Sequence, residues 1–104
     1  MKRIAFTMQL HPGFEDEYRR RHAAIWPELS ALLHDTGIRE YSIFLEEGTL
    51  KLFACLQIED ASALDALPAR EVMQLWWDYM KDIMDTNPDH SPVTRPLKEV
   101  FYLP

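Results

Sequence analysis

Alternating apolar and polar residues divide the chain into four segments with the pattern of β-strands. Residues 3–10 carry Ile, Phe, Met and Leu at every second position, which is typical of a strand with one apolar face. The same alternation runs through residues 38–46 and 50–59, and the short turn between them predicts an antiparallel hairpin. Residues 97–103 are predicted to form the last strand.

Apolar residues spaced three or four positions apart predict helices between these strands. The first helix is expected to begin near Phe14, and Pro27 is expected to break it, because proline lacks an amide hydrogen and disfavours helical geometry at the preceding Trp26. The second helical piece should end at Gly37. The pattern therefore predicts two short helices in place of one long helix.

The second half of the chain repeats the order of helix and strand. A short helix is predicted after Asp60, either Asp60 or Ser62 being a suitable cap, and a longer helix is predicted over residues 70–84. Three prolines between residues 85 and 96 predict a loop, because they can continue neither a helix nor a central strand.

The resulting order is strand, helix, strand, strand, helix, strand, which is typical of a ferredoxin-like α+β fold with a βαββαβ sandwich. Residues 1–104 are expected to form one domain, with both helical segments on one face of an antiparallel four-stranded sheet. The other face of the sheet also carries apolar side chains. We therefore expect a homodimer in which two such sheets pack together as a dimeric α+β barrel.

Composition excludes several classes of partner. No apolar run approaches the ~20 residues that a membrane-spanning helix needs, so we expect no membrane role. The net charge of −6 disfavours binding to a phosphate backbone, so we expect no nucleic-acid partner. Cys55 is the single cysteine, and the amino terminus lacks a signal-peptide pattern; both observations predict a cytoplasmic location.

Three consecutive arginines, Arg19 to Arg21, lie in the first helix. Their simplest interpretation is a solvated face that pairs with the acidic residues 15–17. Arg21 is the exception to this solvated face, because it borders the apolar stripe of the helix.

Tyr18 and His22 lie on the apolar stripe of the first helix, where both side chains should point inward side by side. A buried phenol and imidazole that satisfy each other's hydrogen bonds would explain this pair without any function. An imidazole, however, titrates near ~6.5 and can exchange a proton at cellular pH. His22 is therefore a candidate acid-base residue.

Trp76 and Trp77 are adjacent in the long second helix, so their side chains point about 100° apart. One indole can pack in the core while the other forms the wall of a cavity, and an indole face suits the CH face of a sugar ring. Two core tryptophans are the alternative.

The remaining motifs indicate neither a metal nor a cofactor. The four histidines have no metal-ligand spacing, the chain has only three glycines and no phosphate-binding loop, and no serine or cysteine lies in a nucleophile motif. The functions that these motifs leave open are acid-base catalysis and ligand binding without catalysis.

The sequence resembles the L-rhamnose mutarotase family from end to end. The resemblance rests on the following blocks: YRRRH at residues 18–22, IWPEL at 25–29, Tyr41 with Ile43, WWDYM at 76–80, NPD at 87–89, SP at 91–92 and EVFYLP at 99–104. The chain departs from the family at His90, where asparagine is common.

This resemblance implies a cytoplasmic, dimeric isomerase without a cofactor that interconverts the α and β anomers of L-rhamnose. It implies that His22 is the proton donor and that four residues bind the sugar: Tyr18, Tyr41, Trp76 and Trp77. Two other classes stay open. One is a cofactor-independent monooxygenase of related fold, and the other is a binding module without enzymatic activity.

Overall fold

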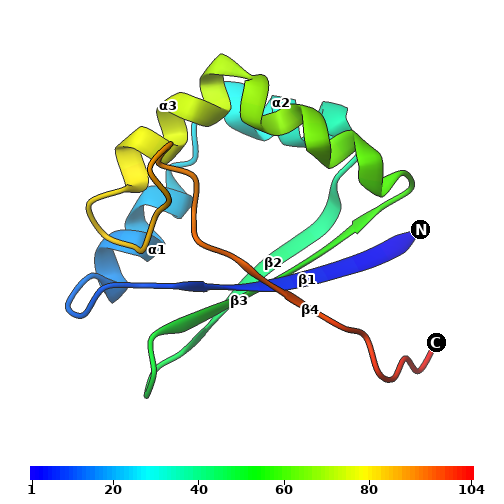
Figure 1. The fold of residues 1–104 in the computed structure, drawn as a ribbon, viewed down its shortest axis with the longest axis horizontal. Helices are drawn as coiled ribbons and strands as arrows, with labels where there is room; N and C mark the ends of the chain where they lie inside the picture. The colour runs from blue at the N-terminus through cyan, green and yellow to red at the C-terminus, as the bar shows by residue number, and fades with distance from the viewer.

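The computed structural model describes all 104 residues and contains one four-stranded antiparallel sheet. The strands are β1 (Lys2–Gln9), β2 (Arg39–Glu46), β3 (Lys51–Ile58) and β4 (Arg95–Leu97), in the order β2-β3-β1-β4. The helices are α1 (Glu15–Ala23), α2 (Pro27–Thr36), the 3-10 helix η1 (Ala61–Ala69) and α3 (Glu71–Met80). All of them lie on one face of the sheet (Figure 1). The predicted ferredoxin-like α+β fold is confirmed.

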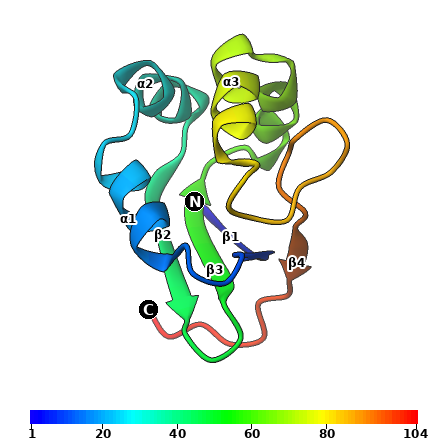
Figure 2. The same ribbon diagram turned by 90° about the vertical axis from the view of Figure 1, so that its left-hand side faces the viewer.

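The predicted break in the first helical region is confirmed. Trp26 has extended backbone geometry, with φ −61° and ψ 132°, and Pro27 is the first residue of α2. Gly37 ends α2 with a φ of +104°, in the left-handed region that glycine adopts without a steric penalty. The chain therefore turns at Trp26, and α1 and α2 lie one after the other along the same side of the sheet (Figure 2).

The main core lies between the helices and the inner face of the sheet. On β3 the inward residues Leu52, Ala54, Leu56 and Ile58 are buried, while the residues between them are more exposed. Apolar residues of α2 and α3 cover this face, and Leu29 and Met80 are almost completely buried. No helix in the structure is long and apolar enough to cross a bilayer.

The prediction for the C-terminal strand was wrong. The strand over residues 97–103 does not form; β4 contains only Arg95–Leu97, which pairs with Thr7, Phe6 and Ala5 of β1. Pro96, which we assigned to the loop, is therefore part of β4. It is tolerated because β4 is the edge strand, where a missing amide hydrogen breaks no ladder.

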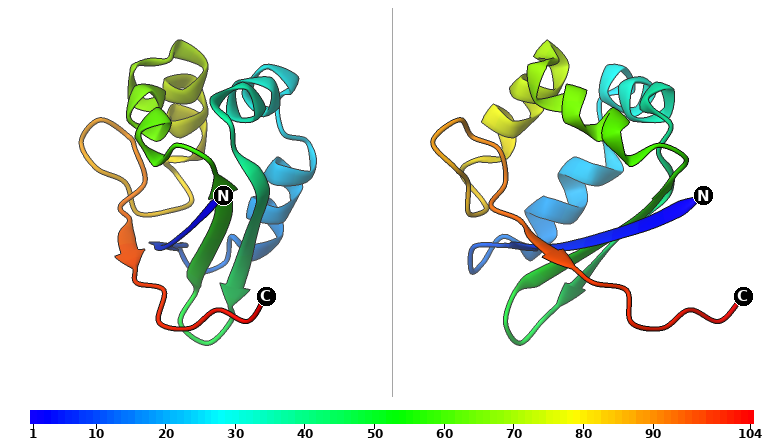
Figure 3. Two further views of the ribbon diagram at one scale, coloured as in Figure 1. Left: turned by 90° about the vertical axis from the view of Figure 1, so that its right-hand side faces the viewer. Right: turned by 45° about the vertical axis from the view of Figure 1, so that its right-hand side comes forward.

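The residues after β4 form contacts through side chains instead of a ladder. Arg3 donates hydrogen bonds to both carboxylate oxygens of Glu99, and its guanidinium lies 3.3 Å from the centre of the Tyr102 ring. The tail follows the side of the sheet away from the helices (Figure 3). The sequence pattern could not separate this arrangement from a strand, because both are extended and rich in apolar residues.

The long second helix is also shorter than predicted. α3 ends at Met80, and residues 81–83 form a turn. Ile83 and Met84 are nevertheless fully buried, and Met84 pairs with Leu10 in an isolated bridge. Their burial explains why the helical pattern continued past the true end of the helix.

The outer face of the sheet carries exposed aromatic side chains. Phe44 of β2 lies directly opposite Phe53 of β3, and 66% and 36% of their surfaces are exposed. In the tail, Val100, Phe101 and Leu103 are also largely exposed. A single chain contains nothing else that covers these residues.

Candidate functional site

Helix α1 presents Tyr18 and His22 together on its inward face. Their rings are stacked, with centroids 4.2 Å apart and planes inclined by 26°. The four-residue spacing puts both side chains on the same helical face, as the sequence predicted. Tyr18 is buried and His22 is half-buried.

A hydrogen bond fixes the orientation and the tautomer of His22. Its Nδ1 lies 3.1 Å from the backbone oxygen of Tyr18. Because a carbonyl oxygen can only accept, Nδ1 carries the proton, and in the neutral ring Nε2 has a free lone pair. Burial lowers the pKa of His22, although the bond to Tyr18 acts in the opposite direction. At neutral pH the imidazole is therefore mainly neutral, with Nε2 able to accept a proton.

Helix α3 places Trp76 against the imidazole. The Trp76 and His22 rings meet edge to face, with centroids 5.4 Å apart and planes at 89°. Trp76 is 6% exposed and also contacts the rings of Trp26 and Tyr79. Trp77, the next residue along α3, is half-buried and lines the same cavity. Trp76 is the more deeply buried of the two, and both indoles line the cavity.

Strand β2 contributes Tyr41 through an irregularity in its pairing with β3. The register shifts between Arg39 and Ser42, and Glu40 has a φ of +50°. Such a bulge redirects the side chains beside it. Although 38% of the Tyr41 surface is exposed, desolvation of its phenol in the cavity raises its pKa to about 12, and burial raises that of Tyr18 further still, with a smaller contribution from Tyr41. Both phenols therefore keep their protons at neutral pH and can act as hydrogen-bond donors.

One continuous space joins these residues. Tyr18, His22, Tyr41, Trp76 and Trp77 all line a cavity of about 1450 Å³ between the helices and the inner face of the sheet. The same five residues also line a smaller recess of about 80 Å³ beside it. All five residues that the sequence singled out are thus brought together from α1, β2 and α3.

Other residues complete the recess, and the sequence identified them only in part. Met8 was predicted to face inward from the alternation in β1, whereas Met73 of α3 was not singled out from the sequence. Thr86, His90 and Pro92 also line the recess, from the loop between α3 and β4. No local pattern indicated that this proline-rich loop would reach the cavity.

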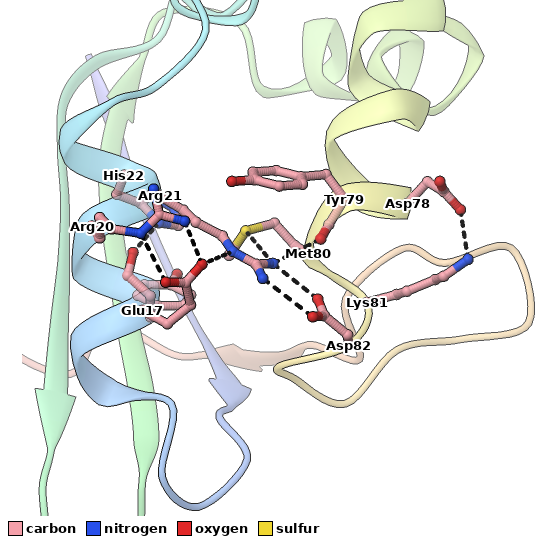
Figure 4. Close-up of polar contacts among 10 residues, drawn as sticks. Glu17, Arg20, Arg21, His22, Asp78, Tyr79, Met80, Lys81 and Asp82 are labelled. Atoms are coloured by element: carbon pink, nitrogen blue, oxygen red, sulfur yellow. Dashed lines mark hydrogen bonds and ion pairs between the residues drawn. The ribbon is translucent and has the colours of Figure 1, made fainter.

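A buried guanidinium ties the two sides of the cavity together (Figure 4). Arg21 of α1 donates a bidentate pair of hydrogen bonds to the Asp82 carboxylate, at 2.9 and 3.2 Å, and a third, of 2.7 Å, to the backbone oxygen of Tyr79. Its Nε donates to Glu17 at 2.7 Å. Arg20 also pairs with Glu17 and stays exposed, as predicted for the solvated face, whereas Arg21, the expected exception, is buried.

No three His, Cys, Asp or Glu side chains lie close enough together to bind a metal ion. The polar side chains that line the smaller recess carry hydroxyls, imidazoles and indole N–H groups, which can form hydrogen bonds with a polar organic molecule. The fold and the site define a small α+β protein with an aromatic pocket that contains imidazole and hydroxyl groups.

Comparisons with known proteins identify the family. The family model described as L-rhamnose mutarotase matches residues 3–103, and the chain belongs to this family. An L-rhamnose mutarotase of Acidiphilium cryptum is 55% identical over 104 residues, covering 100% of both chains. One from Phocaeicola vulgatus is 53% identical over 103 residues, covering 99% of each. The crystal structure of an L-rhamnose mutarotase from Formosa agariphila has a TM-score of 0.93 and 46% identity, with 100% of both chains covered.

The Arg21 contacts predict a large loss of stability when the guanidinium is removed. Arg21→Met should lower the free energy of unfolding by about 1–3 kcal/mol, because it leaves the Asp82 and Glu17 carboxylates without their buried partner. Arg20→Met is the matched control. Its side chain is exposed, so this change should lower stability much less than Arg21→Met does in urea unfolding at neutral pH.

The same contacts predict an acid-dependent stability. Arg20 and Arg21 lower the pKa of Glu17 from 4.5 to about 2, and Arg21 lowers the pKa of Asp82. Because these folded-state pKa values lie below the unfolded values, the contribution is complete above pH 4.5 and is lost as the pH falls toward 2. The difference between wild type and Arg21→Met should therefore shrink over this range. A constant difference would show that the carboxylates are not its source.

Proposed function

We propose that this protein is an isomerase that interconverts the α and β anomers of L-rhamnose. The observation that carries the proposal is the imidazole of His22, oriented by its bond to Tyr18 and facing an aromatic cavity. The full-length relatives bear the name L-rhamnose mutarotase, and this name suggests the substrate.

Anomer exchange requires proton transfer at two oxygens. The anomeric hydroxyl must lose a proton and the ring oxygen must gain one, after which the ring opens, the aldehyde rotates and the ring closes on its other face. His22 is suited to this work, because Nε2 accepts a proton in the neutral ring and donates one in the charged ring. The reaction involves no net oxidation or reduction, and the only groups transferred are protons.

The aromatic residues are suited to holding the sugar. The face of the Trp77 indole can stack on CH groups of a pyranose, while the hydroxyls of Tyr18 and Tyr41 can donate hydrogen bonds to its oxygens. Their raised pKa values keep these hydroxyls protonated over the whole neutral range. Trp76 supports the imidazole from its edge and limits the depth of the pocket.

We further propose that the protein is a cytoplasmic homodimer formed through the outer face of the sheet. The opposed pair Phe44 and Phe53, together with the exposed tail residues, supports this interface. A second sheet on this face would cover apolar surface that is otherwise unusual on a monomer. The single free cysteine, Cys55, is consistent with a reducing compartment.

Replacing the imidazole should remove most of the activity. His22→Asn should retain the fold and lower the rate of anomer exchange by about 10²-fold or more, the contribution of one general acid-base group. Saturation-transfer NMR between the two anomeric protons of L-rhamnose measures this rate, and His11→Asn, which changes a histidine outside the cavity, is the control. A folded His22→Asn protein with wild-type exchange would remove His22 from the mechanism. A monooxygenase or a binding module would show no exchange even as wild type.

Removing the indole wall should affect binding more than catalysis. Trp77→Leu should raise KM about threefold to tenfold and leave kcat within about twofold, because stacking acts on the bound sugar in all its forms. Trp26→Phe is the control, since Trp26 packs on Tyr79 and Trp76 without lining the cavity. Unchanged KM in Trp77→Leu would contradict the stacking role.

The dimer is tested by sedimentation at micromolar concentration. A specific interface should bury at least ~1,000 Å², and the protein should sediment with twice the mass of one chain. Phe44→Glu places a charge at the centre of the exposed aromatic pair and should shift the equilibrium toward monomer. Glu47→Gln, in the exposed turn, is a control that should not. A wild-type monomer would rule out this interface.

A further inference from the structure

Methionine side chains gather around the recess that contains His22. The chain has five methionines, and all except Met1 line this space of about 80 Å³: Met8, Met73, Met80 and Met84. These four residues are called the methionine lining below. A thioether donates no hydrogen bond and accepts only weakly, so the lining offers a bound molecule mainly apolar contacts. The recess therefore combines apolar groups with the imidazole and the phenols described above.

The core holds the methionine lining in place. Met8 lies on β1, Met73 and Met80 lie on α3, and Met84 follows the turn after α3. Met73 precedes Trp76 by three positions and Met80 follows it by four, so these side chains share one face of the helix. All four methionines belong to the main core and are at most 8% exposed. Their positions around the recess are therefore fixed by packing.

The recess is too small for a whole sugar and suits one edge of it. A water molecule needs about 10–15 Å³ of such space, so the recess of about 80 Å³ holds only a few groups of that size. A pyranose with its substituents is larger, and the rest of it would lie in the adjoining cavity, which shares Tyr18, His22 and Tyr41 with the recess. The recess is thus a subsite for one substituent and the ring atoms next to it.

The chemistry of L-rhamnose indicates which substituent this is. The sugar carries a methyl group at C5, and this methyl group is its only ring substituent without oxygen. C5 is also bonded to the ring oxygen, which gains a proton when the ring opens. A recess that holds the methyl group therefore also brings the ring oxygen close to His22. An apolar lining and a proton-exchanging residue in one small space match this part of the molecule.

We propose that the methionine lining binds the methyl group at C5 and so selects 6-deoxyhexoses over hexoses with a hydroxymethyl group there; this inference rests on the proposed function. A hydroxymethyl group would bring its hydroxyl against thioethers and against Ile43, which also lines the recess and forms no hydrogen bond through its side chain. A sugar that lacks this carbon would leave part of the recess without contacts. In both cases the ring oxygen is less well placed for proton exchange with His22, so kcat should fall as well as kcat/KM.

Three sugars with the same configuration at C2, C3 and C4 test the methyl subsite in the wild-type protein. L-rhamnose carries a methyl group at C5, L-mannose carries a hydroxymethyl group, and L-lyxose carries only hydrogen. We expect kcat/KM to be about 10–100-fold lower for L-mannose and about tenfold lower for L-lyxose, which is the discrimination that an apolar pocket achieves for one such group. Saturation-transfer NMR measures each exchange rate, after subtraction of the rate without protein.

Met73→Gln tests whether the methionine lining is the source of this selectivity. Met73 is the most exposed of the four methionines and also lines the larger cavity, so its replacement disturbs the core least. The amide can hydrogen-bond a hydroxymethyl group and packs less well on a methyl group. We therefore expect kcat/KM for L-rhamnose to fall about tenfold, and the ratio between L-rhamnose and L-mannose to narrow by about the same factor.

Two controls separate the loss of an apolar contact from other effects of the substitution. Met73→Leu keeps an apolar side chain of similar volume and should keep the ratio between the two sugars. Leu75→Gln introduces the same amide on α3 at a position that is 52% exposed and outside the cavity. It should change neither the rates nor the ratio. Circular dichroism confirms that each variant is folded.

The outcomes distinguish failure of this inference from failure of the proposed function. A wild-type protein that exchanges the anomers of none of the three sugars would refute the proposed function itself. Equal kcat/KM for L-rhamnose and L-mannose, or for L-rhamnose and L-lyxose, would overturn the methyl subsite alone, and this result needs no variant. A folded Met73→Gln protein that keeps the full ratio would also overturn it, because the methionines would then serve only the core.

Discussion

The geometry of the cavity depends on the guanidinium of Arg21. His22, the next residue, lies on α1, whereas Trp76 and Trp77 lie on α3. Arg21 connects these two helices through hydrogen bonds to Asp82 and to the backbone oxygen of Tyr79. Apolar packing alone is not directional, so it would allow the two helices to slide past each other. A bidentate, charge-assisted contact has a fixed geometry. It therefore fixes α1, which carries His22, against the end of α3, which carries Trp76 and Trp77.

Desolvation in the cavity determines the protonation states of the residues that line it. The same desolvation that lowers the pKa of His22 raises those of Tyr18 and Tyr41, so the recess contains a neutral imidazole and two protonated phenols. Such a set exchanges and donates protons without carrying a charge. Mutarotation already proceeds in water and needs only well-placed proton transfer. A domain of 104 residues is large enough to supply this, provided that its core also serves as the wall of the site.

The two faces of the sheet differ in what covers them. The inner face forms the core and the floor of the cavity, whereas the outer face presents Phe44 and Phe53 to solvent in the single chain. The tail after β4 adds further exposed apolar residues on the same side of the sheet. One four-stranded sheet thus supports the cavity on one side and leaves apolar side chains exposed on the other.

The sequence by itself determined the features that local periodicity encodes: the strands β1 to β3, the break at Trp26, and the shared face of Tyr18 and His22. Each depends on residues within a few positions of one another. Only the tertiary structure decided the partner of Arg21, which lies 61 residues away, the bulge beside Tyr41, and the arrival of His90 at the recess. It also decided that β4 stops at Leu97. These features depend on how elements distant in the sequence pack together and on which backbone groups form hydrogen bonds. The spacing of side chains along the chain contains no information about either.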